Sequence, residues 1–423
     1  MSLLPIVPVR HPVRERHVRV PASKSVANRE LILAAIADGT SHLDLGPLDP
    51  GDDVRAMQEA LVTLGYLVGS QGSVVTVAGA GAAVPQATGP VQAGEAGTVA
   101  RFATALAALG AEPATLDGAP RLRERPLAAL AAALRAAGAT VDRDALPLTV
   151  RGPLRGGHIA IAAHESSQFA SALLLVAPRM TDGLELEITG PVVSAPFLEL
   201  TVAALRARGV TVDRPDERHF RVAPQRVRAR SLAIPGDASA ASYAAAAAAI
   251  LGGTVTIDNV AGRPREGEQG DVRVFALLGR MGCRIAPGRD GVTVTRVGAL
   301  YGIRENVADC SDVFPTLAAV ATQAEGPTEL GGIAHTRRQE SDRIAAVAAA
   351  ITALGGRATA YADAIRIEPV PLRGGVVSAA GDHRIAMAFS ILGLEVPGVA
   401  IDGAETVAKT FPGFYAMIRE LGR

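Results

Sequence analysis

The chain has 423 residues, too many for one ordinary hydrophobic core, so its length predicts two domains. Its 42 basic and 42 acidic residues balance to zero net charge, which argues against a nucleic-acid coat or a binder of anionic membranes. Hydrophobic residues make up 48% of the chain and charged residues 20%, which excludes a disordered protein.

The N-terminal segment and the two cysteines indicate a cytoplasmic protein. Apolar residues come first and arginines follow them, the reverse of the order in a secretory signal. Cys283 and Cys310 make neither a zinc pattern nor a disulfide framework, so both are expected as reduced thiols. The longest alanine-rich run, Ala244 to Ile250, is shorter than the roughly 20 residues of a membrane span. We therefore expect no membrane and no nucleic-acid partner.

Lysine is rare in this chain. Of the 42 basic residues only Lys24 and Lys409 are lysines. A chain with this bias uses arginine wherever either cation suffices, so each lysine marks either a site that needs a compact, titratable ammonium or a chance survival. The residue count alone leaves both interpretations open.

A unit of about 72 residues recurs along the chain. In each unit, apolar residues at helical spacing reach a closing glycine, and two strand-like segments follow. The closing glycines, spaced by 71 to 73 residues, are Gly65, Gly138, Gly209, Gly282 and Gly355. A sixth such helix, Phe414 to Leu421, ends at Gly422, and its missing strands are expected from the region Val18-Arg19-Val20.

Each unit also contains an earlier helix. These helices are expected to begin near Ser25, Gly97, Ser167, Ala238, Asp312 and His383. Six units of this size predict an α/β fold with two pseudo-symmetric lobes of three units each, because one continuous six-fold ring is less compatible with the size of a core. The expected lobes are residues 22–234 and residues 1–21 plus 235–423, with a hinge at the two crossings between them.

The unusual polar residues cluster where these earlier helices begin. Free N–H groups and the positive end of the helix dipole make helix starts ready anion sites. If all six starts face one cleft between the lobes, they would bind a multiply anionic, phosphorylated small molecule. Ser25, Thr98 and Ser167 are also ordinary N-cap types, and Gly97 could simply permit a turn. The spacing of His, Cys, Asp and Glu predicts no metal site, and no cofactor is expected.

These motifs resemble those of the enolpyruvylshikimate-phosphate synthase (3-phosphoshikimate 1-carboxyvinyltransferase) family. The matches run in order from about residue 20 to residue 412. They are Pro21-Ala-Ser-Lys-Ser-Val-Ala-Asn-Arg29, Ala96-Gly-Thr98 with Arg101, Pro120-Arg-Leu-Arg-Glu-Arg-Pro126, Ser166-Ser-Gln-Phe169, Gly236-Asp-Ala-Ser239, Glu340-Ser-Asp-Arg343, Asp382-His-Arg384 and Ala408-Lys-Thr-Phe-Pro412. The resemblance implies the family's inside-out α/β barrel, with two lobes of three βαβαββ-type units.

The resemblance implies transfer of the enolpyruvyl group of phosphoenolpyruvate to the 5-hydroxyl of shikimate 3-phosphate, on the pathway to chorismate and aromatic amino acids. By motif position, Asp312 is the expected base, and Lys24 and Glu340 handle protons. The expected shikimate 3-phosphate residues are Lys24, Ser25, Arg29, Ser166, Ser167, Gln168, Ser194 and Asp312. The expected phosphoenolpyruvate residues are Lys24, Gly97, Arg125, Gln168, Arg343, Arg384 and Lys409.

Several positions depart from the family pattern. The changes are Glu95 for Asn, Phe102 for Pro, Phe197 for Tyr, His335 for Asn and Gln339 for Lys. The loss of a lysine at 339 removes a cation from the acceptor side, where His335, Arg337 or Arg338 could compensate. Gly97 is retained, and the resemblance therefore implies inhibition by glyphosate in competition with phosphoenolpyruvate.

Three alternatives remain at this stage. The chain could transfer enolpyruvyl to another phosphorylated alcohol such as a nucleotide, an option that the altered segment 335–339 favours. The amino-sugar transferase of cell-wall synthesis relies on a loop cysteine, and Arg121 to Pro126 contains none. A non-catalytic binding paralogue would have little reason to keep Asp312, Glu340 and Lys24 together. We expect a monomer whose partners are small anionic substrates.

Overall fold

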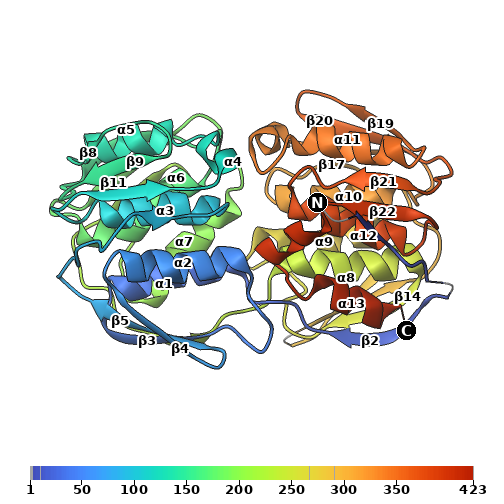
Figure 1. Ribbon diagram of the computed structural model, residues 1–423, viewed down its shortest axis with the longest axis horizontal. Coiled ribbons are helices and arrows are strands. Elements are labelled where there is room, and N and C mark those ends of the chain that lie inside the picture. The colour runs from blue at the N-terminus through green and yellow to red at the C-terminus, as the bar shows by residue number, and fades with distance from the viewer. Residues whose placement is uncertain (1–2, 10, 266, 290, 423) are drawn as a thin grey trace. The chain divides into compact units, whose positions relative to one another are not determined.

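The computed structural model describes residues 3–9, 11–265, 267–289 and 291–422. Its internal contacts divide the chain into two compact units. The first lobe comprises Ala22–Ile234, and the second lobe comprises the N-terminal residues as far as Pro21, Pro235–Arg265 and the chain from Gln269 onward. Each lobe combines three sheets with its own set of helices (Figure 1).

The sheets of the first lobe follow one pattern, in which a parallel pair of strands is extended by antiparallel strands. The first sheet has the order β13 (Ser231–Ala233), β3 (Asp38–Asp44), β5 (Val74–Ala80), β4 (Leu67–Gln71). The second has the order β6 (Val91–Gln92), β7 (Ala114–Asp117), β9 (Leu148–Arg151), β8 (Thr140–Val141). The third has the order β10 (Gly157–Ala162), β11 (Leu184–Thr189), β12 (His219–Val222).

The sheets of the second lobe repeat this pattern. One sheet has the order β15 (Cys283–Pro287), β16 (Val292–Arg296), β14 (Gly253–Ile257), β2 (Val13–Val18). The next has the order β17 (Arg304–Asn306), β18 (Thr328–Gly331), β20 (Ala364–Glu368), β19 (Arg357–Ala360). The last has the order β1 (Leu3–Pro5), β22 (Val399–Asp402), β21 (Gly375–Ser378).

The N-terminal strands correct one prediction. The strand that completes the sixth unit is β1, which pairs antiparallel with β22, and not the Val18-Arg19-Val20 region. That region adjoins β2, which pairs with β14 in the fourth unit. The prediction was wrong because Pro5 suggested an interruption, whereas proline is tolerated at the end of an edge strand, where β1 lies.

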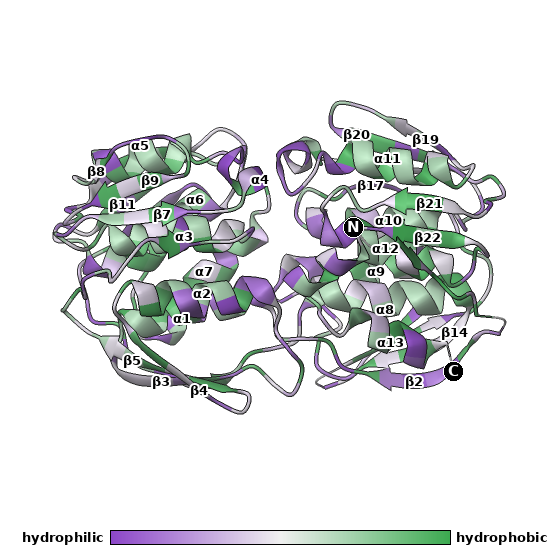
Figure 2. Cartoon of the chain, in the orientation of Figure 1, coloured by the Kyte–Doolittle hydropathy of each residue, from purple (hydrophilic) through white to green (hydrophobic). Residues whose placement is uncertain are grey.

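Three helices form the core of each lobe. In the first lobe, α1 (Lys24–Ala35), α3 (Gly97–Ala107) and α6 (Gln168–Val176) pack against one another, and every residue of α3 is buried. In the second lobe, α8 (Ala238–Leu251), α10 (Phe314–Ala321) and α12 (His383–Gly393) do the same and are buried throughout. Helices that are apolar on all sides belong in a core, and α8 is pale green along most of its length in Figure 2.

The remaining helices bury only part of their surface or are short. In the first lobe they are α2 (Asp52–Thr63), α4 (Pro120–Arg123), α5 (Ala128–Ala136), α7 (Pro196–Ala207) and the 3₁₀ turn η1 (Ala177–Arg179). In the second they are α9 (Arg273–Arg280), α11 (Arg343–Ala353), α13 (Phe414–Leu421) and the 3₁₀ turns η2 (Gly270–Val272), η3 (Ser311–Val313), η4 (Ala334–Arg338) and η5 (Ala404–Lys409). Among the described residues, no helix combines the length and apolarity needed to cross a membrane.

The predicted glycine caps are confirmed. All five closing glycines have φ between 77° and 107°, the left-handed region that glycine adopts without steric cost. At Gly65 the cap is complete, because its N–H donates to the Val62 carbonyl and the N–H of Tyr66 donates to the Leu61 carbonyl, both at 2.9 Å. Each cap ends an outer helix and turns the chain toward the strands that follow.

Candidate active site

The starts of the three core helices of the first lobe lie together. Asn28 Nδ2 in α1 donates to Thr98 Oγ1 in α3 at 2.8 Å, and Arg29 Nη2 donates to Ser171 Oγ in α6 at 3.4 Å. We call the predicted site residues around these helix starts the first-lobe cluster: Lys24, Ser25, Arg29, Gly97, Arg125, Ser166, Ser167, Gln168 and Ser194.

Lys24 is anchored at the first turn of α1 by a buried carboxylate. Its Nζ lies 2.7 Å from Asp53 Oδ2, and the two side chains are 15% and 3% exposed. Asp53 belongs to the first turn of α2, and its backbone carbonyl accepts from Asn28 Nδ2 at 3.4 Å. The ammonium therefore has a fixed position at the edge of the cluster and keeps donors for a ligand.

Gly97 makes room for two guanidinium groups. Its φ lies outside the left-handed region, so the backbone conformation at this position does not by itself require glycine. A Cβ at this position would collide with Arg101 Nη1 and would lie 3.0 Å from Arg125 Nη2. The missing side chain thus lets Arg125 approach the start of α3, where N–H groups and the helix dipole also favour an anion.

The N-cap residues of the core helices in the first lobe make no side-chain cap bonds. Ser23, Ala96 and Ser167 occupy the N-cap positions of α1, α3 and α6, and none of these residues makes a side-chain cap bond. Ser166 Oγ accepts from the backbone N–H of Gln168 at 3.2 Å, and Ser167 is buried. Ser25 and Thr98 therefore lie inside their helices and are not N-caps, whereas Ser167 is at the N-cap position without a side-chain cap bond.

Ser194 has an unusual backbone conformation at the entrance to α7. Its φ is +53°, a value that few non-glycine residues adopt and that often marks a functional position. Its carbonyl accepts from the Phe197 N–H at 3.0 Å, which fixes the start of the helix. Because Phe197 contacts Arg29, Ser194 lies next to the rest of the cluster.

Arg343 is the centre of the second-lobe cluster, which we define as Asp312, Glu340, Arg343, Arg384 and Lys409. Its Nη1 lies 2.8 Å from Asp312, and its Nη2 lies 2.8 Å from Glu340. Its Nε lies 2.7 Å from Asp382, which also caps α12. Burial alone would lower the pKa of Arg343, but the three carboxylates together raise it above its usual value.

Asp312 connects this centre to a second buried arginine. Its Oδ2 lies 2.6 Å from Arg384 Nη2, so one carboxylate bridges two guanidinium groups. Burial would lower the pKa of Arg384, and the attraction of Asp312, its largest opposing influence, helps to raise it well above its usual value. Lys409 Nζ lies 3.8 Å from Glu340 Oε1. The structure thus brings all five members of this cluster together.

Of the two altered residues in the segment before α11, Gln339 contacts this cluster directly, and His335 contacts a neighbour of one of its members. Gln339 Oε1 accepts a hydrogen bond from Arg343 Nη1. His335 Nε2 lies 2.9 Å from the hydroxyl of Ser311, the neighbour of Asp312. Burial lowers the pKa of His335, so its ring is neutral near pH 7. The two substitutions support the cluster as neutral hydrogen-bonding groups.

Sequence reasoning missed several partners of the site residues. Asp53 looked like an ordinary acidic residue in the first turn of a helix, and Asp382 was quoted only within a motif. Asp271 also went unnoticed, although it accepts a hydrogen bond from Ser239 Oγ and is buried. Burial, reinforced by repulsion from Asp312, raises the pKa of Asp271 to about 7. Only the contacts of the folded chain identify these residues.

Comparisons with known proteins agree with this geometry. The family model described as EPSP synthase (3-phosphoshikimate 1-carboxyvinyltransferase) matches residues 12–418. A 3-phosphoshikimate 1-carboxyvinyltransferase of Methanosphaerula palustris is 40% identical over 402 residues, covering 93% of this chain and 94% of the relative. One from Nostoc sp. is 35% identical over 421 residues and covers 98% of each chain.

A solved structure matches the whole fold. The EPSP synthase of Acinetobacter baumannii superposes with a TM-score of 0.83 at 28% identity, covering 100% of this chain and 98% of that one. This match confirms the predicted α/β fold class with its repeated units. By the extent of the family match and the identity to its relatives, the chain belongs to the EPSP synthase (3-phosphoshikimate 1-carboxyvinyltransferase) family.

Proposed function

We propose that this chain transfers the enolpyruvyl group of phosphoenolpyruvate to the 5-hydroxyl of shikimate 3-phosphate and releases phosphate. Membership of the family supports this reaction. The observation that carries it to particular residues is the Asp312 carboxylate, which bridges Arg343 and Arg384 and so combines a base with cations.

The reaction adds the acceptor alcohol across the enol double bond and then eliminates phosphate, so it needs a base, an acid and cationic groups. Asp312 is our candidate for the base that accepts the proton of the 5-hydroxyl. The two arginines fix its orientation, and a carboxylate with about four lone-pair sites can still accept another hydrogen bond. Lys24 and Glu340 are our candidates for protonating the methylene carbon and removing that proton again.

Phosphoenolpyruvate would be bound by cationic side chains that, without a ligand, form ion pairs with carboxylates of the protein. Arg343, Arg384 and Lys409 each contact Asp312 or Glu340. Guanidinium groups bind carboxylate and phosphate oxygens through paired N–H donors, so a bound substrate would share these arginines with Asp312. Gly97, Arg125, Gln168 and Lys24 are our first-lobe candidates for contacts with phosphoenolpyruvate.

Shikimate 3-phosphate would be held mainly by the first-lobe cluster. The start of α1, which has no side-chain cap bond, offers backbone N–H groups, and Ser25, Ser166 and Ser167 offer hydroxyls. Arg29 supplies a buried guanidinium for the acceptor, and Ser194 supplies a further hydroxyl beside α7. Charge-assisted hydrogen bonds of this kind are stronger than neutral ones.

Phosphate release from phosphoenolpyruvate tests the proposal. Shikimate 3-phosphate, shikimate and uridine nucleotides should be compared as acceptors, with the product identified by NMR. Of these acceptors, we expect only shikimate 3-phosphate to cause phosphate release, with one enolpyruvyl ether formed for each phosphate released. Equal or faster release with a nucleotide would assign another acceptor, and release with none would overturn the proposal. Glyphosate is expected to compete with phosphoenolpyruvate in this assay.

We also propose that the chain acts in the cytoplasm as a monomer without a nucleic-acid partner. Its zero net charge and its two buried, unpaired cysteines support this assignment. Light scattering should give the mass of one chain, 43.3 kDa. A mass of two or more chains would contradict the monomer.

A further inference from the structure

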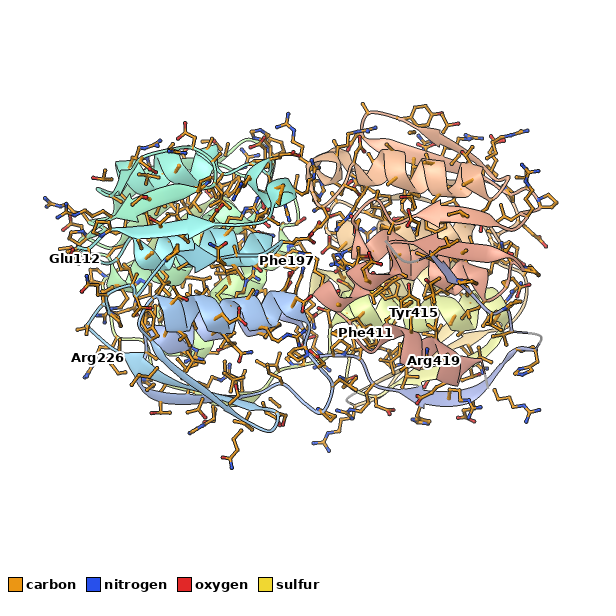
Figure 3. All side chains as sticks on the ribbon, viewed as in Figure 1. Glu112, Phe197, Arg226, Phe411, Tyr415 and Arg419 are labelled. Atoms are coloured by element: carbon orange, nitrogen blue, oxygen red, sulfur yellow. The ribbon has the colours of Figure 1, made fainter. Side chains whose placement is uncertain are left out.

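The guanidinium of Arg29 lies over two phenyl rings. Its Cζ is 5.2 Å from the centroid of Phe102 and 5.7 Å from that of Phe197. Phe102 belongs to the buried helix α3, and Phe197, labelled in Figure 3, lies in the first turn of α7. A cation near aromatic faces is attracted by the ring quadrupole, most strongly where water is excluded.

The hydrogen bonds of Arg29 complete this enclosure with neutral acceptors. Its Nε donates to Thr201 Oγ1 at 2.8 Å, and its Nη1 donates to the Ser25 carbonyl at 2.8 Å. Its Nη2 donates to the Phe197 carbonyl at 3.1 Å. Burial lowers the pKa of Arg29 to about 9, and the ion pairs within the described part of the chain give it no carboxylate. The rings therefore occupy the place that a carboxylate takes beside Arg208, another buried arginine of this lobe.

Arg208 makes the contrast clear. It is as deeply buried as Arg29, but its guanidinium lies 2.7 Å from the carboxylate of Glu30. A buried charge is costly unless it is paired and hydrogen-bonded. Arg208 meets that cost with an internal anion, whereas Arg29 has dipoles and ring faces and stays available to an anion from outside.

We propose that Phe102 and Phe197 are positioning residues that hold the Arg29 guanidinium for the anionic, hydroxylated acceptor. The inference rests on the proposed function and deepens it. We call Phe102 and Phe197, together with the guanidinium that both rings contact, the clamp. A guanidinium held in place by contacts with two rings loses little conformational freedom when the acceptor binds.

Phe197→Leu tests the clamp through substrate affinity. Removing one ring should raise the KM for shikimate 3-phosphate about tenfold, as expected for one desolvated cation–π contact. The KM for phosphoenolpyruvate and kcat should change less than about twofold, because only acceptor binding loses a contact. Phe197→Tyr should restore the affinity because it restores the ring. Equal changes in both KM values, or no rescue by tyrosine, would overturn the proposal.

Phe220→Leu is the matched control. Phe220 is also buried in the first lobe and lies 5.0 Å from the Cζ of Arg214, but Arg214 is paired with Glu199 and belongs to neither cluster. Its loss should lower stability and leave the KM for shikimate 3-phosphate unchanged. A rise in that KM equal to the rise in Phe197→Leu would show that any ring loss in this lobe has the same effect and would overturn the clamp.

A second readout does not depend on the reaction. In protein labelled with ¹⁵N at arginine Nε, the Arg29 signal, identified by its loss in Arg29→Lys, should lie upfield because of the two ring currents. The signal should move downfield in Phe197→Leu and in Phe102→Leu, and stay in place in Phe220→Leu. An unshifted signal in the wild-type protein overturns the clamp even if the enzyme is active. A shifted signal in a protein inactive with shikimate 3-phosphate would overturn the proposed function and the acceptor role, while keeping the clamp itself.

Discussion

The two lobes begin most of their core helices in different ways, although α10 of the second lobe, like the core helices of the first, has no side-chain cap bond. In the second lobe, Asp237 and Asp382 cap α8 and α12, accepting from backbone N–H groups at 2.9 Å. In the first lobe, α1, α3 and α6 begin without a side-chain cap bond. The same architecture therefore presents open N–H groups and hydroxyls in one lobe, and carboxylates that organise arginines in the other.

This difference assigns distinct chemistry to each lobe. Open helix starts bind an anion without needing to displace one. Arg343 and Arg384 are already positioned by ion pairs with carboxylates in the absence of substrate. Both contact Asp312, the candidate base. We therefore propose that acceptor binding depends mainly on first-lobe residues. Second-lobe residues would serve phosphoenolpyruvate binding and proton transfer, with Gly97 and Arg125 as first-lobe exceptions. The predictions below test this division, from the largest effect to the smallest.

Asp312→Asn should have the largest effect. Losing a general base lowers kcat by about 10² to 10⁴, whereas the neutral amide keeps the shape that binds ligands. Phosphate release measures kcat, and calorimetry should give a dissociation constant for shikimate 3-phosphate close to wild type. Asp309→Asn is the control, because Asp309 lies near η3 but pairs with Arg273 outside the cluster. A parallel loss of binding and turnover in Asp312→Asn would argue against its role as base.

Gly97→Ala should weaken phosphoenolpyruvate binding. The added Cβ would displace Arg125 and Arg101, and losing one charge-assisted contact raises KM about ten- to a hundredfold. The KM for shikimate 3-phosphate should change much less. Gly69→Ala provides the control, because a Cβ there meets nothing within 4 Å. An unchanged KM for phosphoenolpyruvate in Gly97→Ala would separate Arg125 from this substrate.

Asp271 should make the stability of the protein depend on pH. Its folded pKa of about 7 lies above the ordinary value of 3.8, so the folded state binds the extra proton between these pH values. The contribution of Asp271 is therefore present below about pH 4 and is lost as the pH rises through 7. Asp271→Asn should flatten this part of the profile in urea unfolding. A profile identical to wild type would show that Asp271 ionises as it does in the unfolded chain.

Helix capping should give the smallest effect. Asp237→Ala removes a cap bond from α8 and should lower the free energy of unfolding by about 0.5–2 kcal/mol. Ser167→Ala removes no cap bond and should change it by less than about 0.5 kcal/mol. Urea unfolding measures both. Equal losses would remove the difference between the lobes.

The local parts of the fold were the predictable ones. Gly65 and Gly355 could be identified as C-caps because a glycine directly after a helical apolar pattern indicates a left-handed backbone conformation that ends the helix. The partner of β1 could not be identified, because strand pairing across almost 400 residues leaves no local signal in three residues. Whether a strand is central or at the edge of a sheet can be determined only once all strands of that sheet are known.

The candidate site divides in the same way. Motif positions predicted which side chains gather at the helix starts, and Lys24 and Lys409 both lie in a cluster. The motifs could not predict that Asp53 anchors Lys24 or that two phenyl rings enclose Arg29, because these contacts join separate helices. Charge compensation within a buried site depends on tertiary packing and has no fixed sequence spacing.

Affinity measurements on one variant from each lobe test the central claim most directly. Ser167→Ala should weaken shikimate 3-phosphate binding about tenfold and leave the KM for phosphoenolpyruvate within about twofold, because a charge-assisted contact is lost only to the acceptor. Arg384→Lys should do the reverse, because lysine cannot reproduce the paired N–H donors. If each variant weakened both substrates equally, or if the two effects were exchanged, the division of work between the lobes would be contradicted.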